Sequence, residues 1–238
     1  LYIRDLGIAN APIRPVVTGF EHEQGVVYAA AGKLYILTNM GAPNRKVVVA
    51  DAADPAPEKW KDLIPETSFP VSVSSCGKKL FAQYVRDAVS QVFQYSLNGK
   101  KEREITLPGL GTAGGFGGKQ EDTTLYYTFT SYVYPPTIFH YDIRSGASEV
   151  YKKSDVKFDP SQYESRQVFY HSKDGTRVPM ILTYKKGLRQ DGKNPVMLYG
   201  YGGFNINLTP SFSISNLVFM EQGGIFVVAN LRGGGEYG

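Results

Sequence analysis

The amino-acid sequence predicts an incomplete β-propeller followed by the first elements of an α/β layer. Three observations support this prediction. A short apolar strand pattern recurs at an interval of about 45 residues in the N-terminal part of the 238-residue chain. No segment before residue 150 has a sustained helical period. Beyond residue 159, two apolar strand-like runs flank a segment with helical spacing, which is the order typical of an α/β sheet.

The repeat is carried by four segments in which an apolar and aromatic strand ends in a small or acidic residue. These segments are residues 1–5, 47–51, 92–96 and 138–142. A second pattern follows the same interval: a leucine and an aromatic residue stand side by side, each pair after a polar turn. These pairs are residues 34–35, 80–81 and 125–126. Further strand-like runs, at residues 26–38 and 71–73, indicate several strands in each unit.

An interval near 45 residues with several strands per unit is typical of a propeller blade, which is a sheet of about four strands. The alternative is a chance recurrence in a tyrosine-rich β-sandwich, whose strands need not return at a constant interval. Three complete periods cannot close a ring, because propellers need about four to eight blades. We therefore expect part of a propeller. The chain begins with Leu1 rather than Met and stops in a glycine run at Gly238, so we expect both ends to be cut from a longer protein.

The sequence pattern changes near Asp159, where the repeat ends. Residues 167–170 and 177–184 are strand-like, and a Lys-Asp-Gly turn at residues 173–175 joins them. Two strands separated by so short a turn predict a β-hairpin.

The remaining elements have the order strand, helix, strand. The apolar runs at residues 196–199 and 225–229 predict two buried strands. Between them, residues 211–222 carry apolar side chains at helical spacing. Ser213 is a candidate N-cap, and Gly223 is placed to end the helix. We therefore expect the beginning of an α/β sheet in this part of the chain.

Composition and charge exclude several classes of function. The 26 basic and 22 acidic side chains are scattered and form no basic stripe, so nucleic-acid binding is not expected. The single cysteine, Cys76, can form neither an internal disulfide nor a CxxC metal site, and we expect a small buried side chain there. No apolar run approaches the roughly 20 residues of a transmembrane helix. No His, Cys and Asp residues have metal-ligand spacing, so a metal is not expected.

Two glycine-rich motifs differ in what they indicate. Residues 109–114 fit the GxGxxG pattern, but further glycines follow instead of a helix, so an inter-strand connection is the better interpretation. The run Tyr-Gly-Tyr-Gly-Gly-Phe at residues 199–204 follows an apolar strand directly, and ligands collect at strand ends in open α/β sheets. Tyr201 and Phe204 would offer a hydroxyl group and a flat apolar face. A tight crossover loop with two packing aromatic residues explains this run equally well.

No nucleophile can be placed in the sequence. A GxSxG-like motif, which would hold a hydrolase serine, is missing. The three histidines, His22, His140 and His171, have no convincing serine or aspartate partner, and we interpret them as structural or surface residues. The polypeptide by itself is therefore not expected to catalyse a reaction.

Two motifs carry a specific resemblance to a known family. The first is Tyr-Gly-Tyr-Gly-Gly-Phe-Asn at residues 199–205, followed by Thr209-Pro210, and the second is Val-Ala-Asn-Leu-Arg-Gly-Gly-Gly-Glu-Tyr-Gly at residues 228–238. Both closely resemble the prolyl oligopeptidase (prolyl endopeptidase) family of serine peptidases. Thinner similarity extends through the rest of the chain, at residues 54–55, 58–60, 65–66, 129–131, 172–176, 178–180 and 191–192. Related oligopeptidase and dipeptidyl-peptidase branches differ in the glycine loop, so the resemblance favours the prolyl branch.

The resemblance implies a seven-bladed propeller that lies over the active site of an α/β-hydrolase domain. Residues 1–158 would then be the C-terminal blades of the propeller. Residues 159–238 would be the N-terminal part of the α/β-hydrolase peptidase domain. This organisation agrees with the repeat and with the change of pattern near residue 159.

The resemblance also implies roles for two residues. Tyr201 matches the family tyrosine whose hydroxyl group helps to form the oxyanion hole, and Phe204 matches an aromatic residue that lines the S1 pocket. The serine, aspartate and histidine of the family's catalytic triad would fall beyond Gly238, so no triad residue is assigned in this chain. The family uses no metal or organic cofactor.

The resulting hypothesis is a serine-type endopeptidase that hydrolyses short peptides on the carboxyl side of proline. This chain would carry only part of the enzyme and would be inactive alone. The expected partners are short proline-containing peptides, not nucleic acid or membranes, and we expect a monomer when the protein is full length. Two alternatives stay open: a non-catalytic propeller module that binds a partner, and a related oligopeptidase with a different S1 specificity. The sequence does not distinguish the cytoplasm from the periplasm.

Overall fold

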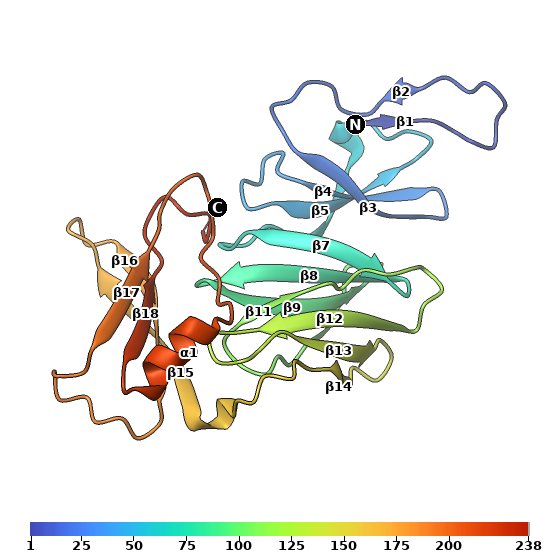
Figure 1. Cartoon of the computed structure of the whole chain (residues 1–238). Coiled ribbons are helices and arrows are strands. Elements are labelled where there is room, and N and C mark those ends of the chain that lie inside the picture. The colour runs from blue at the N-terminus through green and yellow to red at the C-terminus, as the bar shows by residue number, and fades with distance from the viewer. Residues whose placement is uncertain (238) are drawn as a thin grey trace.

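The computed structural model describes residues 1–237 and contains three four-stranded antiparallel sheets followed by one mixed sheet (Figure 1). Each antiparallel sheet is a simple meander, and we call the three the first, second and third blade. The first blade consists of β3 (Gln24–Ala30), β4 (Lys33–Thr38), β5 (Lys46–Asp51) and β6 (Lys61–Ile64). The second consists of β7 (Val71–Cys76), β8 (Lys79–Arg86), β9 (Val89–Ser96) and β10 (Lys101–Glu104). The third consists of β11 (Thr112–Gly114), β12 (Thr124–Thr130), β13 (Thr137–Asp142) and β14 (Ser148–Lys152).

The blades confirm the repeat that the sequence predicts. The leucine-aromatic pairs lie on β4, β8 and β12, which are the second strands of the three blades. The segments ending in a small or acidic residue lie on β5, β9 and β13, the third strands. The three blades fan side by side in Figure 1 and do not close a ring.

The first member of the repeat series differs from the others. Residues 1–5 contribute only β1 (Tyr2–Ile3), which pairs with β2 (Arg14–Pro15) in a separate two-stranded sheet. Within the described residues, this strand has no further neighbours that would extend the pair into a blade.

Aromatic rings fill the space between the second and third blades. Phe81 of the second blade stacks on Phe116 of the third, with ring centroids 6.1 Å apart. Phe116 in turn stacks on Tyr127 at 4.7 Å, and Tyr127 on Phe139 at 5.1 Å. Strand β12 alternates buried and exposed side chains, as expected for a strand with one face in a core. Each fully buried aromatic ring stabilises the fold by on the order of 2 kcal/mol through the hydrophobic effect. The rings of this cluster therefore pack the second blade against the third.

A buried glutamine links the same two blades through hydrogen bonds. Gln94 of β9 accepts a 2.6 Å hydrogen bond from the hydroxyl group of Tyr141. Its amide nitrogen donates to Glu102, at 2.7 Å, and to the backbone oxygen of Ile143, at 3.1 Å. Tyr141 and Ile143 belong to the third blade segment, so the glutamine joins the two sheets at their core.

The mixed sheet has the strand order β15-β16-β18-β17 and carries one helix. Its elements are η2 (Pro160–Gln162), β15 (Tyr163–His171), β16 (Arg177–Lys185), β17 (Val196–Gly200), α1 (Ile214–Glu221) and β18 (Ile225–Ala229). Strands β15 and β16 form the predicted hairpin, and β17 pairs with β18 in parallel. A parallel pair needs a crossover, and α1 provides it.

The helix confirms the sequence prediction with shorter bounds. It spans Ile214–Glu221 inside the predicted residues 211–222, with Ser213 at the N-cap position. The Ser213 hydroxyl group bonds to Ser215 rather than to a backbone N–H group. Gly223 follows the C-cap with φ of +87°, a left-handed conformation that glycine adopts at little cost.

One of the two predicted buried strands is exposed. Every residue of β18 is buried, but every residue of β17 is exposed, including Leu198 at 66%. Strand β17 lies at the edge of the sheet and pairs only with β18, so neighbours cover it on one side only. The apolar run predicted a strand with other elements packed on both of its faces. Among residues 1–237, no elements cover the faces of β17, so its side chains are exposed.

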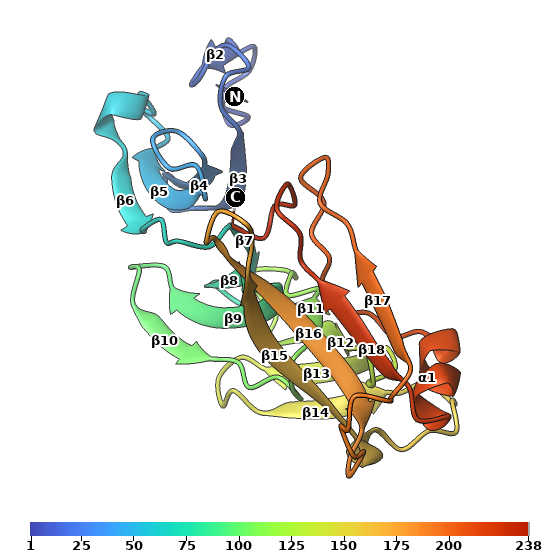
Figure 2. The same ribbon diagram turned by 90° about the vertical axis from the view of Figure 1, so that its left-hand side faces the viewer.

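The third blade packs directly on the mixed sheet, and the two views place them side by side (Figures 1 and 2). Tyr132, from the loop after β12, is buried in a cluster with Leu217 and Met220 of α1 and Phe226 of β18. The Thr112 hydroxyl group of β11 donates a 2.7 Å hydrogen bond to the backbone oxygen of Pro210. These contacts fix the mixed sheet against the blades.

Cys76 is buried at the end of β7, as the sequence predicts. Among residues 1–237, no helix is both long and apolar enough to span a bilayer.

Candidate functional site at the glycine-rich loops

The loop after β17 carries both residues that the sequence singles out. Tyr201 directly follows the strand and is 37% exposed. Phe204 lies three residues later and is 92% exposed, so its ring faces solvent. Phe204 and Asn205 have positive φ angles of +52° and +57°, which marks a sharp turn. The Tyr201 ring lies over Gly203, because a Cβ atom there would be 3.2 Å from the tyrosine hydroxyl oxygen.

A second glycine-rich segment, residues 230–237, follows β18 and runs beside this loop. The Asn205 backbone N–H group donates a 3.2 Å hydrogen bond to the backbone oxygen of Gly233. Because β17 and β18 are parallel neighbours, both segments leave the sheet at the same end (Figure 2). We call the first segment, residues 201–208, the tyrosine loop, and the second the glycine segment.

Glycine is required where these two segments meet. A Cβ atom on Gly202 would overlap the backbone oxygen of Arg232. One on Gly233 would lie 2.5 Å from the backbone oxygen of Gly202, and Gly233 also has φ of +99°. Real Cβ atoms do not approach oxygen so closely, so a side chain at either position would separate the segments. The glycines of both motifs thus permit a close backbone approach.

A buried carboxylate fastens the ends of the two segments. Glu236 is 3% exposed and accepts hydrogen bonds of 3.0 Å from the Leu208 backbone N–H group and from the Asn230 side-chain amide. The same Asn230 amide donates to the backbone oxygen of Leu208 at 2.8 Å. Among the described residues, no lysine or arginine forms an ion pair with Glu236. A backbone donor and an amide donor therefore share one oxygen, Oε1, of this carboxylate.

The glycine segment also contacts the rest of the molecule through two side chains. Arg232 forms an ion pair with Asp174 in the β15–β16 turn and donates a 2.9 Å hydrogen bond to Thr176. The hydrogen bond from Arg232 holds the pKa of Asp174 well below its usual value. The Tyr237 hydroxyl group donates a 2.6 Å hydrogen bond to the Asp87 carboxylate of the second blade. Partial burial, together with this hydrogen bond, raises the pKa of Tyr237 well above its usual value, so the phenol stays protonated at neutral pH.

A polar cavity lies between the tyrosine loop and the first blade. It has a volume of about 400 Å³, and Asn205, Asn207 and Gly235 line it on one side. On the other side lie Glu23 and Arg45, which form an ion pair at 2.7 Å. The tyrosine loop therefore faces the blades across a space that can hold polar groups.

Other features that the sequence raised lie away from these loops. Of the run at 109–114, residues 109–111 connect β10 to β11 as predicted, whereas residues 112–114 are β11 itself, and β12 rather than a helix follows. His140 lies on β13 with its ring 5.2 Å from that of Tyr126, and His171 ends β15. Among residues 1–237, no three His, Cys, Asp or Glu side chains are placed to hold a metal ion.

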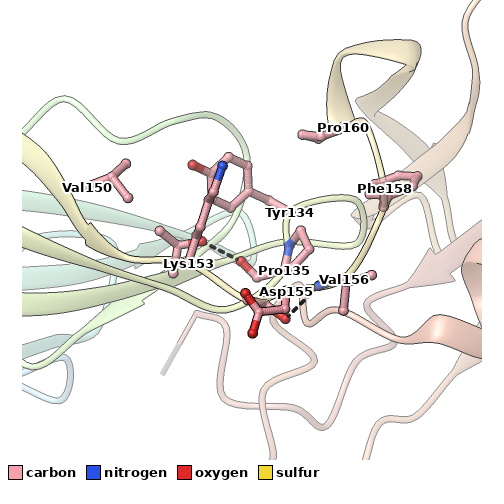
Figure 3. A pocket seen from close by; sticks show the side chains of 10 residues that line it. Tyr134, Pro135, Val150, Lys153, Asp155, Val156, Phe158 and Pro160 are labelled. Carbon is pink, nitrogen blue, oxygen red and sulfur yellow. Dashed lines mark hydrogen bonds between the residues drawn. The ribbon is translucent and has the colours of Figure 1, made fainter.

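A second cavity, of about 550 Å³, also lies apart from the tyrosine loop (Figure 3). It is bounded by the third blade and by the chain that leads to β15. In Figure 3, Tyr134 and Pro135 border it on the blade side, and Phe158 and Pro160 lie on the connecting chain. None of the predicted site residues contributes to its lining.

A comparison with protein families matches the blades to a known sequence profile. Residues 1–154 match the N-terminal β-propeller domain of prolyl oligopeptidase. The chain belongs to the prolyl oligopeptidase family. The match covers all three blades of the structure, so the incomplete propeller predicted from the repeat is confirmed.

Curated relatives within the prolyl oligopeptidase family extend the match through the mixed sheet. The prolyl endopeptidase of Elizabethkingia miricola is 54% identical over all 238 residues of this chain. That of Dictyostelium discoideum is 36% identical over 221 residues, which is 87% of this chain. The chain spans 34% and 29% of these two relatives, about a third of their length.

Solved structures of the family have the same fold. A prolyl endopeptidase studied for the role of inter-domain dynamics in catalysis and specificity superposes with a TM-score of 0.88 at 42% identity. It matches all of this chain and 35% of its own. Oligopeptidase B from Leishmania major superposes with a TM-score of 0.83 at 24% identity, a likeness of fold alone.

Sequence reasoning missed several residues of this site. Glu236 and Tyr237 were part of the motif that carried the family resemblance, but nothing in the sequence gave them a role. The one available signal was a glutamate inside a run of glycines, because glycines alone suffice for a turn. Asp87 and the Glu23–Arg45 pair had no signal, because their partners are distant in sequence.

Proposed function

We propose that the whole protein is a prolyl oligopeptidase, a serine peptidase that hydrolyses short peptides on the carboxyl side of proline. The observation that carries this proposal is Tyr201, a partly exposed phenol just beyond the end of β17, in a chain that is 54% identical to a prolyl endopeptidase. Ligand sites in open α/β sheets lie beyond the carboxyl ends of the strands.

The proposal includes a division of the chain into two parts. Residues 1–158 would belong to the propeller, and residues 159–238 would begin an α/β-hydrolase peptidase domain. The parallel pair of β17 and β18, joined through α1, supports this division. So does the end of the repeat at β14, which is followed by a sheet of different topology.

Tyr201 would act on the oxygen of the scissile carbonyl group. When a serine hydroxyl group adds to that carbonyl, its oxygen becomes negatively charged in the tetrahedral intermediate. A phenol O–H group held about 2.7 Å from this oxygen stabilises the charge, and one such donor contributes about 3 kcal/mol. The serine, aspartate and histidine implied by the family resemblance would come from outside this chain.

Phe204 would form one wall of the pocket for the proline ring. A flat apolar ring suits the apolar face of proline. Its 92% exposure leaves the ring available to a substrate. The polar cavity beside Asn205 and Asn207 would accommodate the peptide backbone next to that proline. From these two features we infer that the substrates are short peptides that contain proline.

Proline specificity is favoured over another specificity by the pattern of identities. Prolyl endopeptidases are 54%, 52% and 36% identical to this chain, whereas oligopeptidase B from Leishmania major is 24% identical. The test is to profile cleavage of a mixed peptide library by the full-length protein. We expect cleavage after proline. Cleavage mainly after arginine or lysine would contradict the proposed specificity.

The role of Tyr201 is tested by Tyr201→Phe in the full-length protein. We expect kcat on a short proline-containing peptide to fall about a hundredfold, because the donor is lost while the ring is kept. Tyr199→Phe, two residues earlier on β17, is the matched control and should keep normal activity. If Tyr201→Phe is as active as the Tyr199→Phe control and the unmodified enzyme, Tyr201 does not form the oxyanion hole.

A further inference from the structure

The hydrogen bond between Tyr237 and Asp87 lies at one end of a continuous series of contacts that reaches Tyr201. Asp87 is at the tip of the β8–β9 hairpin, in the second blade. Tyr237 is the last described residue of the glycine segment. The intervening contacts all join the glycine segment to the tyrosine loop.

These contacts follow one another residue by residue. Gly202 lies against Arg232, and Asn205 donates to Gly233. A Cβ atom on Gly234 would lie 2.8 Å from the backbone oxygen of Ile206. Leu208 finally donates to the Glu236 carboxylate at 3.0 Å. The tyrosine loop is therefore held along its length by the glycine segment, and the glycine segment ends at Asp87.

The hairpin tip that holds Tyr237 has an unusual conformation. Asp87 and Ala88 both have positive φ angles, +49° and +69°, in a two-residue turn. Such turns favour Asn-Gly, because residues with a Cβ atom are strained there. Ala88 is also fully buried. Strained backbone persists where its surroundings enforce it, and such positions cluster at functional sites.

The tip is held from two directions. Gln167 of β15 donates a side-chain hydrogen bond to the backbone oxygen of Asp87. Tyr237 donates to its carboxylate, and the Tyr237 ring lies 6.0 Å from that of Phe69. The hairpin of the second blade is thus a fixed point to which the end of the glycine segment is attached.

We propose that Tyr237 and Glu236 are positioning residues, which use Asp87 of the second blade as an anchor to hold the tyrosine loop and its Tyr201 hydroxyl group in place. Tyr237 fixes the end of the glycine segment. Glu236 transfers that position to Leu208 at the end of the tyrosine loop and to Asn230 at the start of the glycine segment. This inference rests on the proposed oxyanion role of Tyr201.

The first test removes the anchor in the full-length enzyme. Tyr237→Phe and Asp87→Ala should each lower kcat about tenfold with KM changed less than about twofold, because misplacing a donor weakens transition-state binding most. Asp87→Asn should keep most of the activity, since its side-chain oxygen still accepts from the phenol. Tyr151→Phe is the matched control, an exposed tyrosine of β14 at the edge of the third blade.

The second test asks whether the anchor acts through Tyr201. Tyr237→Phe is combined with Tyr201→Phe, and kcat is compared in a double-mutant cycle. We expect the double variant to match Tyr201→Phe alone, since a hydroxyl group that is already missing cannot be misplaced. A full tenfold additional loss in the double variant would overturn the inference. So would a Tyr237→Phe variant as active as Tyr151→Phe.

These outcomes separate the inference from the proposed function. If Tyr201→Phe is as active as the unmodified enzyme, the oxyanion role fails, and positioning through Tyr201 fails with it. If Tyr201→Phe is impaired but Tyr237→Phe is silent or additive, only the positioning role fails. Glu236→Ala removes the oxygen that accepts from both donors and should lower kcat as Tyr237→Phe does, whereas full activity of Glu236→Ala would overturn the positioning role of Glu236.

Discussion

The ring of Tyr132 packs edge-on against the ring of Phe226, with centroids 5.4 Å apart and planes at 72°. Tyr132 comes from the third blade, and Phe226 from β18 at the centre of the mixed sheet. Edge-to-face contacts of this kind add roughly 0.5–1.5 kcal/mol to the free energy of burial. This tyrosine is the main side chain through which the blades enter the core of the mixed sheet.

Truncation of Tyr132 should destabilise the protein strongly. Tyr132→Ala leaves a cavity between the blade and the sheet, and we expect it to lower the free energy of unfolding by about 3–4 kcal/mol. Tyr132→Phe keeps the ring and serves as the control, with a loss of less than about 1 kcal/mol. Thermal and urea unfolding of the full-length variants measure these changes in the free energy of unfolding. Similar stability of the two variants would show that the ring contact contributes little.

Substitution of Gly233 should disrupt both glycine-rich segments. Gly233→Ala places a Cβ atom against Gly202 and forces alanine into a left-handed conformation, and we expect a loss of about 2 kcal/mol or more. Peptidase activity should fall with it, since the tyrosine loop must move. Gly109→Ala is the matched control, because a Cβ atom there meets no neighbouring atom. We expect it to change stability by less than about 0.5 kcal/mol. If Gly233→Ala is as stable as Gly109→Ala, the backbones of the two segments do not approach as closely as described.

Removal of the Gln94 side-chain amide should weaken the contact between the second and third blades. Gln94→Leu has a similar size but leaves the Tyr141 hydroxyl group and the Glu102 carboxylate without this partner. A buried polar group without a partner costs about 1–3 kcal/mol, so we expect a loss of about 3 kcal/mol. Gln91→Leu is the control, because this half-buried glutamine of the same strand bonds to Glu104 of its own blade and not to the third blade. Restored stability in Gln94→Leu combined with Tyr141→Phe would confirm the cause.

Cys76 should be unreactive in the folded protein. Burial, with a smaller contribution from Asp122, raises the pKa of its thiol from 9.0 to about 11, so the reactive thiolate is rare at pH 8. We expect iodoacetamide to label Cys76 only after unfolding. Rapid labelling of the native protein at pH 8 would contradict the observed burial.

The same pKa predicts a change of stability at high pH. A group whose folded-state pKa is raised stabilises the fold fully below its unfolded pKa, and this contribution is lost as the pH rises through the folded pKa. For Cys76 the loss should occur between about pH 9 and pH 11. The stability difference between the unmodified protein and Cys76→Ala should shrink over this interval. A constant difference would show that the thiol pKa is not shifted.

The blades could be predicted from the sequence because their information is local and repeated. Leu34, Leu80 and Leu125 occupy equivalent positions in three successive sheets, and the interval between them sets the blade length. The hairpin and the helix were predictable for the same reason, since turn and cap residues lie next to the elements they end. These features require no knowledge of distant contacts.

The exposed β17 and the anchoring contacts could not be predicted in this way. The apolar residues of β17 match those of a buried strand, and only the strand order places Leu198 at an edge. Glu236 and Tyr237 act through partners 28 and 150 residues away, and no spacing rule connects them. Gln94 is likewise one of several polar residues of β9, and its burial depends on the neighbouring blade.

The distances along the chain between these partners also set an order for synthesis on the ribosome. Each blade pairs strands that follow one another in the sequence, so it can fold soon after it leaves the ribosome. The bond from Thr112 to Pro210 spans 98 residues, and the one from Tyr237 to Asp87 spans 150. Translation therefore delivers the acceptor on the hairpin long before its phenol donor. The nascent blades can serve as a finished template on which the later sheet assembles.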